Sequence, residues 1–133
     1  MIDHASTYAT DYDATIRFYD AVLPGLGYVR QMDRVARWSP DWPTQRMCAY
    51  GPKGRPIYWI YEAREEATPR HIAFVARKRA EVDAFHRAGL EAGGKDNGAP
   101  GPRPQYHPGY YGAFLLDPDG NNVEAVVHGP DRD

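Results

Sequence analysis

Apolar and polar residues alternate along several short segments of the chain, which is the pattern of strands that bury one face. In the segment 70–76, Ile72, Phe74 and Ala76 form one apolar face, and His71 falls on the other face. In the segment 122–128 the odd-numbered residues are apolar, and Glu124 falls on the other face. His71 and Glu124 are therefore predicted to point away from the helices that cover the apolar faces.

Two segments have apolar residues at helical spacing instead. The helix predicted at 12–23 can be capped by Asp11, and the helix predicted at 79–92 ends at a pair of glycines. Further strands are predicted at 2–8, 27–33, 46–50, 56–61 and 110–116. The chain then reads as one domain, residues 1–133, with a first module over about 1–61, a linker at 62–69 and a second module over about 70–128.

The order of elements recurs because the second half of the chain resembles the first half in sequence. His4 and His71 lie 67 residues apart, and the turn sequences Gly-Pro-Lys-Gly and Asp-Pro-Asp-Gly lie 66 apart, which pairs Tyr58 with Glu124. A duplicated half-domain with a pseudo-twofold axis is expected to bring equivalent positions together at the axis. His4, His71 and Glu124 could then form one set of metal ligands, with the two halves paired either within one chain or between two chains.

Composition describes an ordinary globular chain, with 42% apolar and 26% charged residues and a net charge of −2. That charge gives no long-range attraction to nucleic acid or to an anionic membrane, and no apolar run approaches the length of a membrane span. The single cysteine, Cys48, excludes an intrachain disulfide, and with no signal-peptide pattern at the N-terminus a cytoplasmic location is expected.

Residues 95–109 are rich in proline and glycine and are predicted to form a long loop, a kind of segment that often carries function. The loop ends in an aromatic cluster that contains His107, and its tyrosines could line a substrate pocket together with Trp59; these tyrosines are Tyr106, Tyr110 and Tyr111. His107 could transfer protons there. Packing against a sheet edge, the core or a dimer interface would explain the same residues.

Four segments in the right order resemble the vicinal oxygen chelate superfamily, which includes glyoxalase I, bleomycin-resistance proteins, extradiol dioxygenases and fosfomycin-resistance enzymes. These segments are Ile2–His4, Arg17–Leu23, Arg70–Phe74 and Phe114–Glu124. The resemblance implies an α+β fold in which two tandem βαβββ modules form a curved mixed sheet around a central cleft. It also implies a small-molecule ligand and a homodimer.

In glyoxalase I-like members four positions bind a divalent metal, and the resemblance maps them onto His4, Tyr58, His71 and Glu124. Tyr58 stands where those proteins carry a glutamate, and a phenol is a poor base and a weak ligand. The remaining His-His-Glu set resembles a facial triad that suits Zn, Ni, Fe or Mn. Glu124, Tyr58 and His107 are the candidate catalytic residues.

Three functions follow from these observations. The first is a metal-dependent lyase, isomerase or dioxygenase that chelates vicinal oxygens of a small substrate. The second is a metal-free protein of the bleomycin-resistance type that binds an aromatic compound or antibiotic. The third is a structural or regulatory module, which would leave the triad unexplained.

Overall fold

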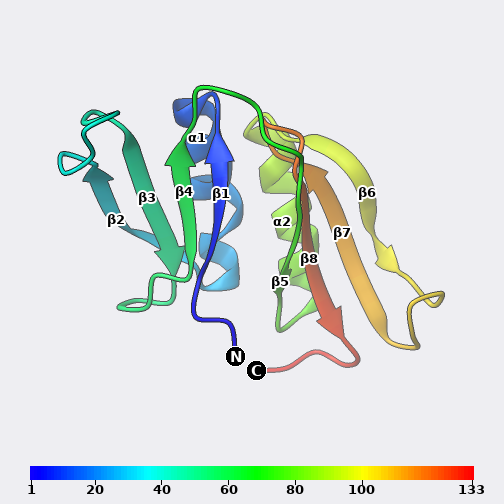
Figure 1. Ribbon diagram of the computed structural model, residues 1–133. Helices are drawn as coiled ribbons and strands as arrows, with labels where there is room; N and C mark the ends of the chain where they lie inside the picture. The colour runs from blue at the N-terminus through cyan, green and yellow to red at the C-terminus, as the bar shows by residue number, and fades with distance from the viewer.

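The computed structural model describes residues 1–133 and contains two modules of the same construction (Figure 1). The elements of the first module, in chain order, are β1 (Ala5–Ala9), α1 (Tyr12–Val22), a short 3-10 helix (Pro24–Leu26), β2 (Val29–Val35), β3 (Arg46–Gly51) and β4 (Tyr58–Glu62). Those of the second are β5 (His71–Val75), α2 (Arg79–Glu91), β6 (Lys95–Pro102), β7 (Tyr110–Leu116) and β8 (Asn122–His128). The predicted pair of βαβββ modules and the α+β fold class are confirmed.

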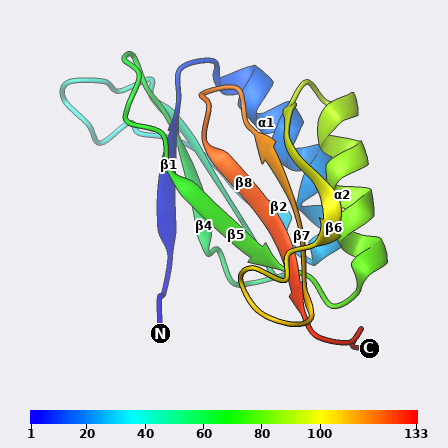
Figure 2. The same cartoon turned by 90° about the vertical axis from the view of Figure 1, so that its right-hand side faces the viewer.

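Each module forms its own four-stranded sheet, in the orders β1-β4-β3-β2 and β5-β8-β7-β6. The inner pairs β1–β4 and β5–β8 are parallel, and the other neighbours are antiparallel. Both helices cover the same side of the two sheets (Figures 1 and 2). The opposite side, which we call the open face, carries no helix.

Helix α1 forms where the sequence predicts it because both its N-terminal cap and its apolar inner face favour a helix. The Asp11 side chain accepts a hydrogen bond from the Ala14 amide at 3.1 Å, which satisfies one of the free amides of the first turn. Phe18 and Val22, one turn apart, are buried on the inner face. This face packs against α2 and joins the two modules.

One hydrophobic core of 19 buried residues spans both modules. Phe74 on β5 lies edge-on to two aromatic rings of the first module, Tyr28 and Tyr58, with ring centroids 5.3 Å apart in each case. Because the apolar sides of both sheets contribute to this core, the modules are not independent units of packing.

A buried carboxylate, Asp117, lies at the junction of the modules. It accepts hydrogen bonds from the Tyr19 hydroxyl of α1 at 2.6 Å and from the Asn121 side-chain amide at 2.8 Å. The backbone amides of Asp119 and Asn121 donate to its other oxygen. Asn121 also donates to Thr7 on β1 and accepts from the Arg70 amide ahead of β5. The turn between β7 and β8 is thereby fastened to the first module.

The prediction of a loop at 95–109 is wrong over its first half. Residues Lys95–Pro102 form the edge strand β6, which pairs with β7 through two register shifts. Prolines are tolerated there because an edge strand has one side with no partner for its amides. No helix of the structure is long and apolar enough to cross a membrane.

We expect Asp117→Ala to lower the free energy of unfolding by about 3 kcal/mol, because four donors lose their acceptor and several of them are buried. Urea denaturation followed by fluorescence measures the change. Asp41→Ala, at an exposed position, is the matched control and should change stability by less than about 0.5 kcal/mol. Equal stabilities for the two variants would contradict the structural role of Asp117.

Candidate functional site

His71 and Glu124 lie together on the open face, as strand parity predicts. The Nε2 atom of His71, on β5, is 3.0 Å from Oε1 of Glu124 on β8. The Glu124 side chain is 3% exposed, whereas that of His71 is 51% exposed. A buried acceptor therefore meets a ligand-type nitrogen that is open to solvent.

Backbone pairing fixes the orientation of the imidazole. Nδ1 of His71 lies 3.0 Å from the backbone carbonyl of Asn122, its register partner on β8. A carbonyl can only accept, so Nδ1 carries a hydrogen and Nε2 is the ring nitrogen that faces Glu124. An imidazole nitrogen and a carboxylate oxygen at this distance share a proton or bind a cation between them.

The spacing of this pair fits a divalent cation. Two ligand atoms that are each about 2.1 Å from an ion, at adjacent positions of its shell, lie about 3 Å apart. Ligating histidines commonly donate their second N–H to a carbonyl, and ligating carboxylates are themselves hydrogen-bonded. His71 meets the first condition through Asn122, and Glu124 meets the second through Tyr110.

Tyr110 on β7 supports Glu124 from the other side. Its hydroxyl donates a hydrogen bond to Oε2 of Glu124. Burial, together with the hydrogen bond and the negative charge of Glu124, raises the pKa of Tyr110 well above its usual value, so the phenol keeps its proton. Gly112 makes room for both groups, because a Cβ there would come within 3.2 Å of Glu124 Oε2 and of the Tyr110 ring.

His107 and His128 flank Tyr110 at the outer end of the site. Their rings stack at 5.1 Å, with Nε2 of His107 2.9 Å from Nδ1 of His128, and each lies edge-on to the Tyr110 ring. His107 therefore contacts the tyrosine and not Glu124. Tyr106, 58% exposed, packs edge-on against Tyr110 with ring centroids 4.9 Å apart.

The structure does not bring His4 to this pair. His4 precedes β1 and contacts Asp3 at 2.6 Å. Strands β1 and β5 run in opposite directions, so their starting residues lie at opposite ends of the two sheets (Figure 1). Within one chain no group of three or more His, Cys, Asp or Glu side chains could hold a metal.

Pairing Tyr58 with Glu124 is wrong. In the register of β5 and β8, Glu124 lies opposite Ala73, two residues after His71. In the register of β1 and β4, the residue opposite Ser6, two after His4, is Trp59. Trp59 is thus the equivalent of Glu124, and Tyr58 faces the helices.

Tyr58 is a core residue. It is 2% exposed, and its hydroxyl donates to that of Tyr19 at 2.9 Å, which extends the Asp117 network. Burial raises its pKa well above the usual value for a tyrosine. Tyr58 can therefore neither reach the open face nor act as a base there.

Of the predicted substrate-binding residues, Tyr111 also points the other way. Its hydroxyl donates to Asp83 on α2 at 2.7 Å, so it lies on the helix side of the sheet. Trp59 lies on the open face of the first module, stacked on Tyr61 with centroids 6.2 Å apart. Tyr106 and Tyr110 remain beside Glu124.

Sequence reasoning missed three contributors to the site: Gly112, Asn122 and His128. The alternation of side chains along β7 and β8 carried this information. Tyr110, Gly112 and Phe114 lie on one face of β7. Their register partners on β8 lie on the same face; these partners are His128, Val126 and Glu124.

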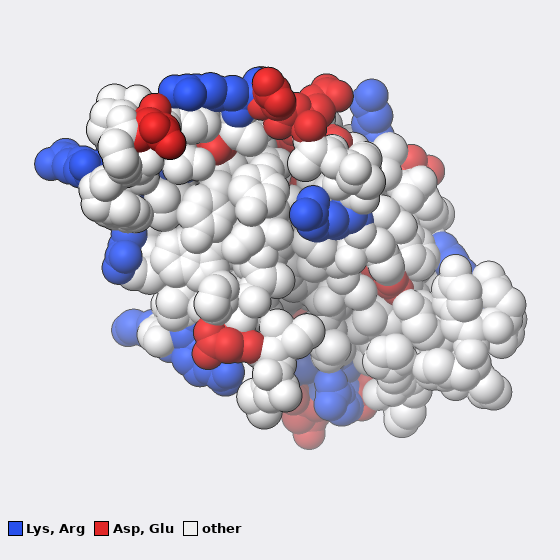
Figure 3. Space-filling view, viewed as in Figure 1, with Lys and Arg blue, Asp and Glu red and all other residues white.

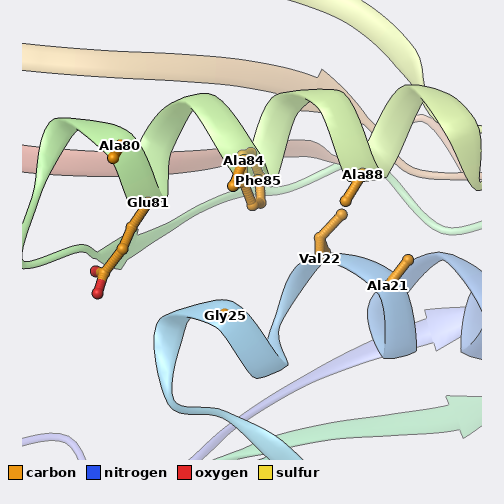
Figure 4. A pocket seen from close by; sticks show the side chains of 8 residues that line it. All are labelled: Ala21, Val22, Gly25, Ala80, Glu81, Ala84, Phe85 and Ala88. Atoms are coloured by element: carbon orange, nitrogen blue, oxygen red, sulfur yellow. The ribbon is translucent and has the colours of Figure 1, made fainter.

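Two surfaces frame these residues. The open face is mostly uncharged and is hollowed between the modules, with charged side chains mainly at its rim (Figure 3). A separate apolar hollow of about 260 Å³ lies between α1 and α2 on the helix side (Figure 4). Its one charged residue, Glu81, is paired with Arg77 at 3.0 Å, so this hollow carries no group free for chemistry.

We expect Tyr58→Phe to lower the free energy of unfolding by about 1 kcal/mol, the value of one buried hydrogen bond, and to leave ligand binding on the open face unchanged. Tyr8→Phe, at an exposed tyrosine, is the control for stability. Chemical denaturation and titration of metal ions test both halves of this expectation. A loss of metal affinity in Tyr58→Phe at unchanged stability would return Tyr58 to the site.

Solved structures share this fold. A glyoxalase/bleomycin resistance protein from Albidiferax ferrireducens T118 is 26% identical, with a TM-score of 0.74 over 94% of this chain and 96% of that chain. A glyoxalase I mutant from Zea mays is 20% identical, with a TM-score of 0.68 over 94% of this chain and 46% of that chain. A mutant of the fosfomycin resistance protein FosX from Listeria monocytogenes is 16% identical, with a TM-score of 0.67 over 94% and 90%.

No curated protein sequence matches the chain. The model of the Glyoxalase/Bleomycin resistance protein/Dioxygenase superfamily, however, matches residues 1–125. The chain therefore belongs to the glyoxalase/bleomycin resistance protein/dioxygenase superfamily, as the repeated modules and their sequence segments predicted.

Proposed function

We propose that this protein is a divalent-metal-dependent enzyme that chelates vicinal oxygens of a small substrate, with lyase, isomerase or dioxygenase chemistry. The observation that carries the proposal is the pair formed by His71 Nε2 and Glu124 Oε1, two atoms of ligand type 3.0 Å apart. Zn, Ni, Fe and Mn all accept imidazole and carboxylate ligands.

His71 and Glu124 would hold the metal from the second module. The Asn122 carbonyl orients the imidazole, and Tyr110 leaves one carboxylate oxygen of Glu124 free to bind. Because these supporting contacts come from strands of one sheet, the pair is held in position before a metal arrives.

The third ligand in this proposal is His4 of a second copy of the chain. His4 and His71 lie at opposite ends of the sheets within one chain, and His4 is 55% exposed. A homodimer with the open faces of unlike modules opposed would place His4 of one copy beside His71 and Glu124 of the other. Each dimer would then have two equivalent sites.

A bound metal would supply a Lewis acid that stabilises negative charge on a chelated substrate oxygen. Glu124 is the group placed to accept a proton from the substrate, because it is the buried carboxylate of the open face. Tyr110, which keeps its proton, donates to Glu124 and positions it. His107 and His128 hold Tyr110 in place, so His107 acts as a positioning residue and transfers no proton to Glu124 directly.

A relative supports the class of chemistry. The Listeria fosfomycin resistance protein was solved in complex with Mn(II) and 1S,2S-dihydroxypropylphosphonic acid, a compound with oxygens on neighbouring carbons. A structure of that fold that contains both a divalent metal and a vicinal diol supports the same use of the His71–Glu124 pair here.

A metal-free binding protein is the second candidate, because aromatic rings gather on the open face of the first module. Tyr61 lies 6.0 Å from Tyr8 and 6.2 Å from Trp59 between ring centroids, and Tyr8 is 41% exposed. Such a surface could stack on a planar ligand. Metal binding separates the two candidates, since a binder of this kind has no need of the His71–Glu124 pair.

We expect protein stripped with a chelator and titrated with Ni(II) or Mn(II) to bind one ion per chain, as measured by calorimetry and elemental analysis. His71→Ala and Glu124→Gln should abolish binding, and Tyr110→Phe should weaken it roughly tenfold to a hundredfold through the lost support of Glu124. His86→Asn is the control, because His86 pairs with Asp96 away from the open face. A parent protein that binds no metal while it binds aromatic compounds would overturn the enzyme proposal.

We expect mixing of two inactive variants to restore metal sites if His4 acts between copies. In dimers of one His4→Ala chain and one Glu124→Gln chain, one of the two sites keeps all its ligands, so a random mixture should bind about a quarter of the parent amount. A mixture of His71→Ala and Glu124→Gln chains is the control and should restore no sites. His71 and Glu124 of one chain belong to the same proposed site, so every site in such a mixture lacks one of these two ligands. No recovery in the first mixture would contradict the arrangement between copies.

A further inference from the structure

A second hollow, separate from the one between the helices, lies on the open face beside the His71–Glu124 pair. It has a volume of about 250 Å³ and is lined by Asn97, Gly98, Arg103, Tyr106, Phe114 and Asn122. The Phe114 ring separates it from His71, with ring centroids 6.3 Å apart. A molecule held by His71 and Glu124 could therefore extend into this hollow.

Arg103 supplies a positive charge that no carboxylate in the chain neutralises. Its guanidinium is held by backbone carbonyls, with donation to Gly101 at 2.9 Å, to Pro102 at 3.3 Å and to Ala99 at 2.7 Å. A guanidinium has five N–H donors, so these three contacts leave donors free. The group lies over the Phe114 ring at 5.4 Å, which fixes it at the wall of the hollow.

Asn122 lacks a hydrogen-bond donor at the edge of the hollow. Its side-chain oxygen is shielded from solvent and is the one buried side-chain nitrogen or oxygen without a hydrogen-bond partner. This oxygen accepts only, so its partner would be a hydroxyl or another donor of a bound molecule and not an anionic oxygen. The backbone carbonyl of the same residue holds His71. Asn122 thus belongs both to the candidate metal site and to the adjoining hollow.

No acidic residue lines the hollow. The nearest in sequence, Asp96, is turned away and accepts hydrogen bonds from His86 on α2 and from the Gly98 amide. Gly98 has a φ of +151° and lies against Phe114, where a Cβ would come within 2.8 Å of the ring. The bulge at Gly98 thereby keeps the wall of the hollow close to Phe114 and Arg103.

We infer that this hollow receives the anionic group of the substrate, so that the substrate is a small organic anion, a carboxylate or a phosphonate. This inference rests on the proposed function, since it concerns the same site. Arg103 provides the charge and its free N–H donors, and the Asn97 amide N–H groups and the Tyr106 hydroxyl are further donors that line the hollow. A hydroxyl beside the anionic group would be the donor that the Asn122 side-chain oxygen lacks. Oxygens next to the anionic group would then face His71 and Glu124.

Metal-free protein tests the hollow without the metal site. Lactate and methylphosphonate are titrated into chelator-treated full-length protein, and backbone amide NMR shifts are followed at Gly98 and Gly112. Propane-1,2-diol, the uncharged counterpart of lactate, is the ligand control. We expect both anions to shift the Gly98 amide in a saturable way and the diol to leave it unchanged.

Variants locate the binding. Arg103→Gln should weaken anion binding at least tenfold, Arg103→Lys should retain part of it, and Asn122→Asp, nearly the same in shape, should abolish it by repulsion. Arg87→Gln, at an exposed arginine on α2, is the matched control. Equal binding of the diol and the anions, or unchanged binding in both Arg103→Gln and Asn122→Asp, would overturn the inference. A failure of metal binding alone would overturn the proposed enzyme and leave this result in place.

Discussion

The buried carboxylate of Asp117 is the constraint on which the arrangement of the two modules depends. Through Tyr19 and Asn121 it connects α1, β1 and the start of β5 to a single turn. A buried polar network is stable only when its members are satisfied, so these donors and acceptors define one relative placement of the modules. Hydrophobic contacts such as that between Tyr58 and Phe74 add stability to this placement without specifying it as narrowly.

That placement decides what the open face offers. The two inner strands β1 and β5 run in opposite directions, so the twofold relation between the modules separates residues at strand beginnings. His71 and Glu124 meet because they belong to neighbouring strands of one sheet, and their contacts follow from local register. The second module thus supplies two candidate ligands, His71 and Glu124, together with the contacts that hold them. The remaining side of this pair is open.

Local periodicity was sufficient to predict part of the site and both α-helices. The side-chain period of two placed His71 and Glu124 on one face because both strands are regular. The assignment of Tyr58 failed because an offset of 66 from matching turns differs by one residue from the register of the strands, and a shift of one residue moves a side chain to the other face. His4 lies away from the pair within one chain, and sequence similarity carries no information on whether equivalent positions meet within a chain or between copies. The strand β6 was missed because proline and glycine are compatible with an edge strand that has bulges.

The prolines of β6 also bear on how copies of this chain can meet. An unprotected sheet edge offers amides and carbonyls to a strand of another molecule, and proline and bulges remove that opportunity. β6 forms the outer edge of the second sheet and carries both Pro100 and Pro102 together with its register shifts. Continuation of the second sheet into a neighbouring molecule is therefore disfavoured at this edge, and self-association is directed towards contacts between side-chain surfaces.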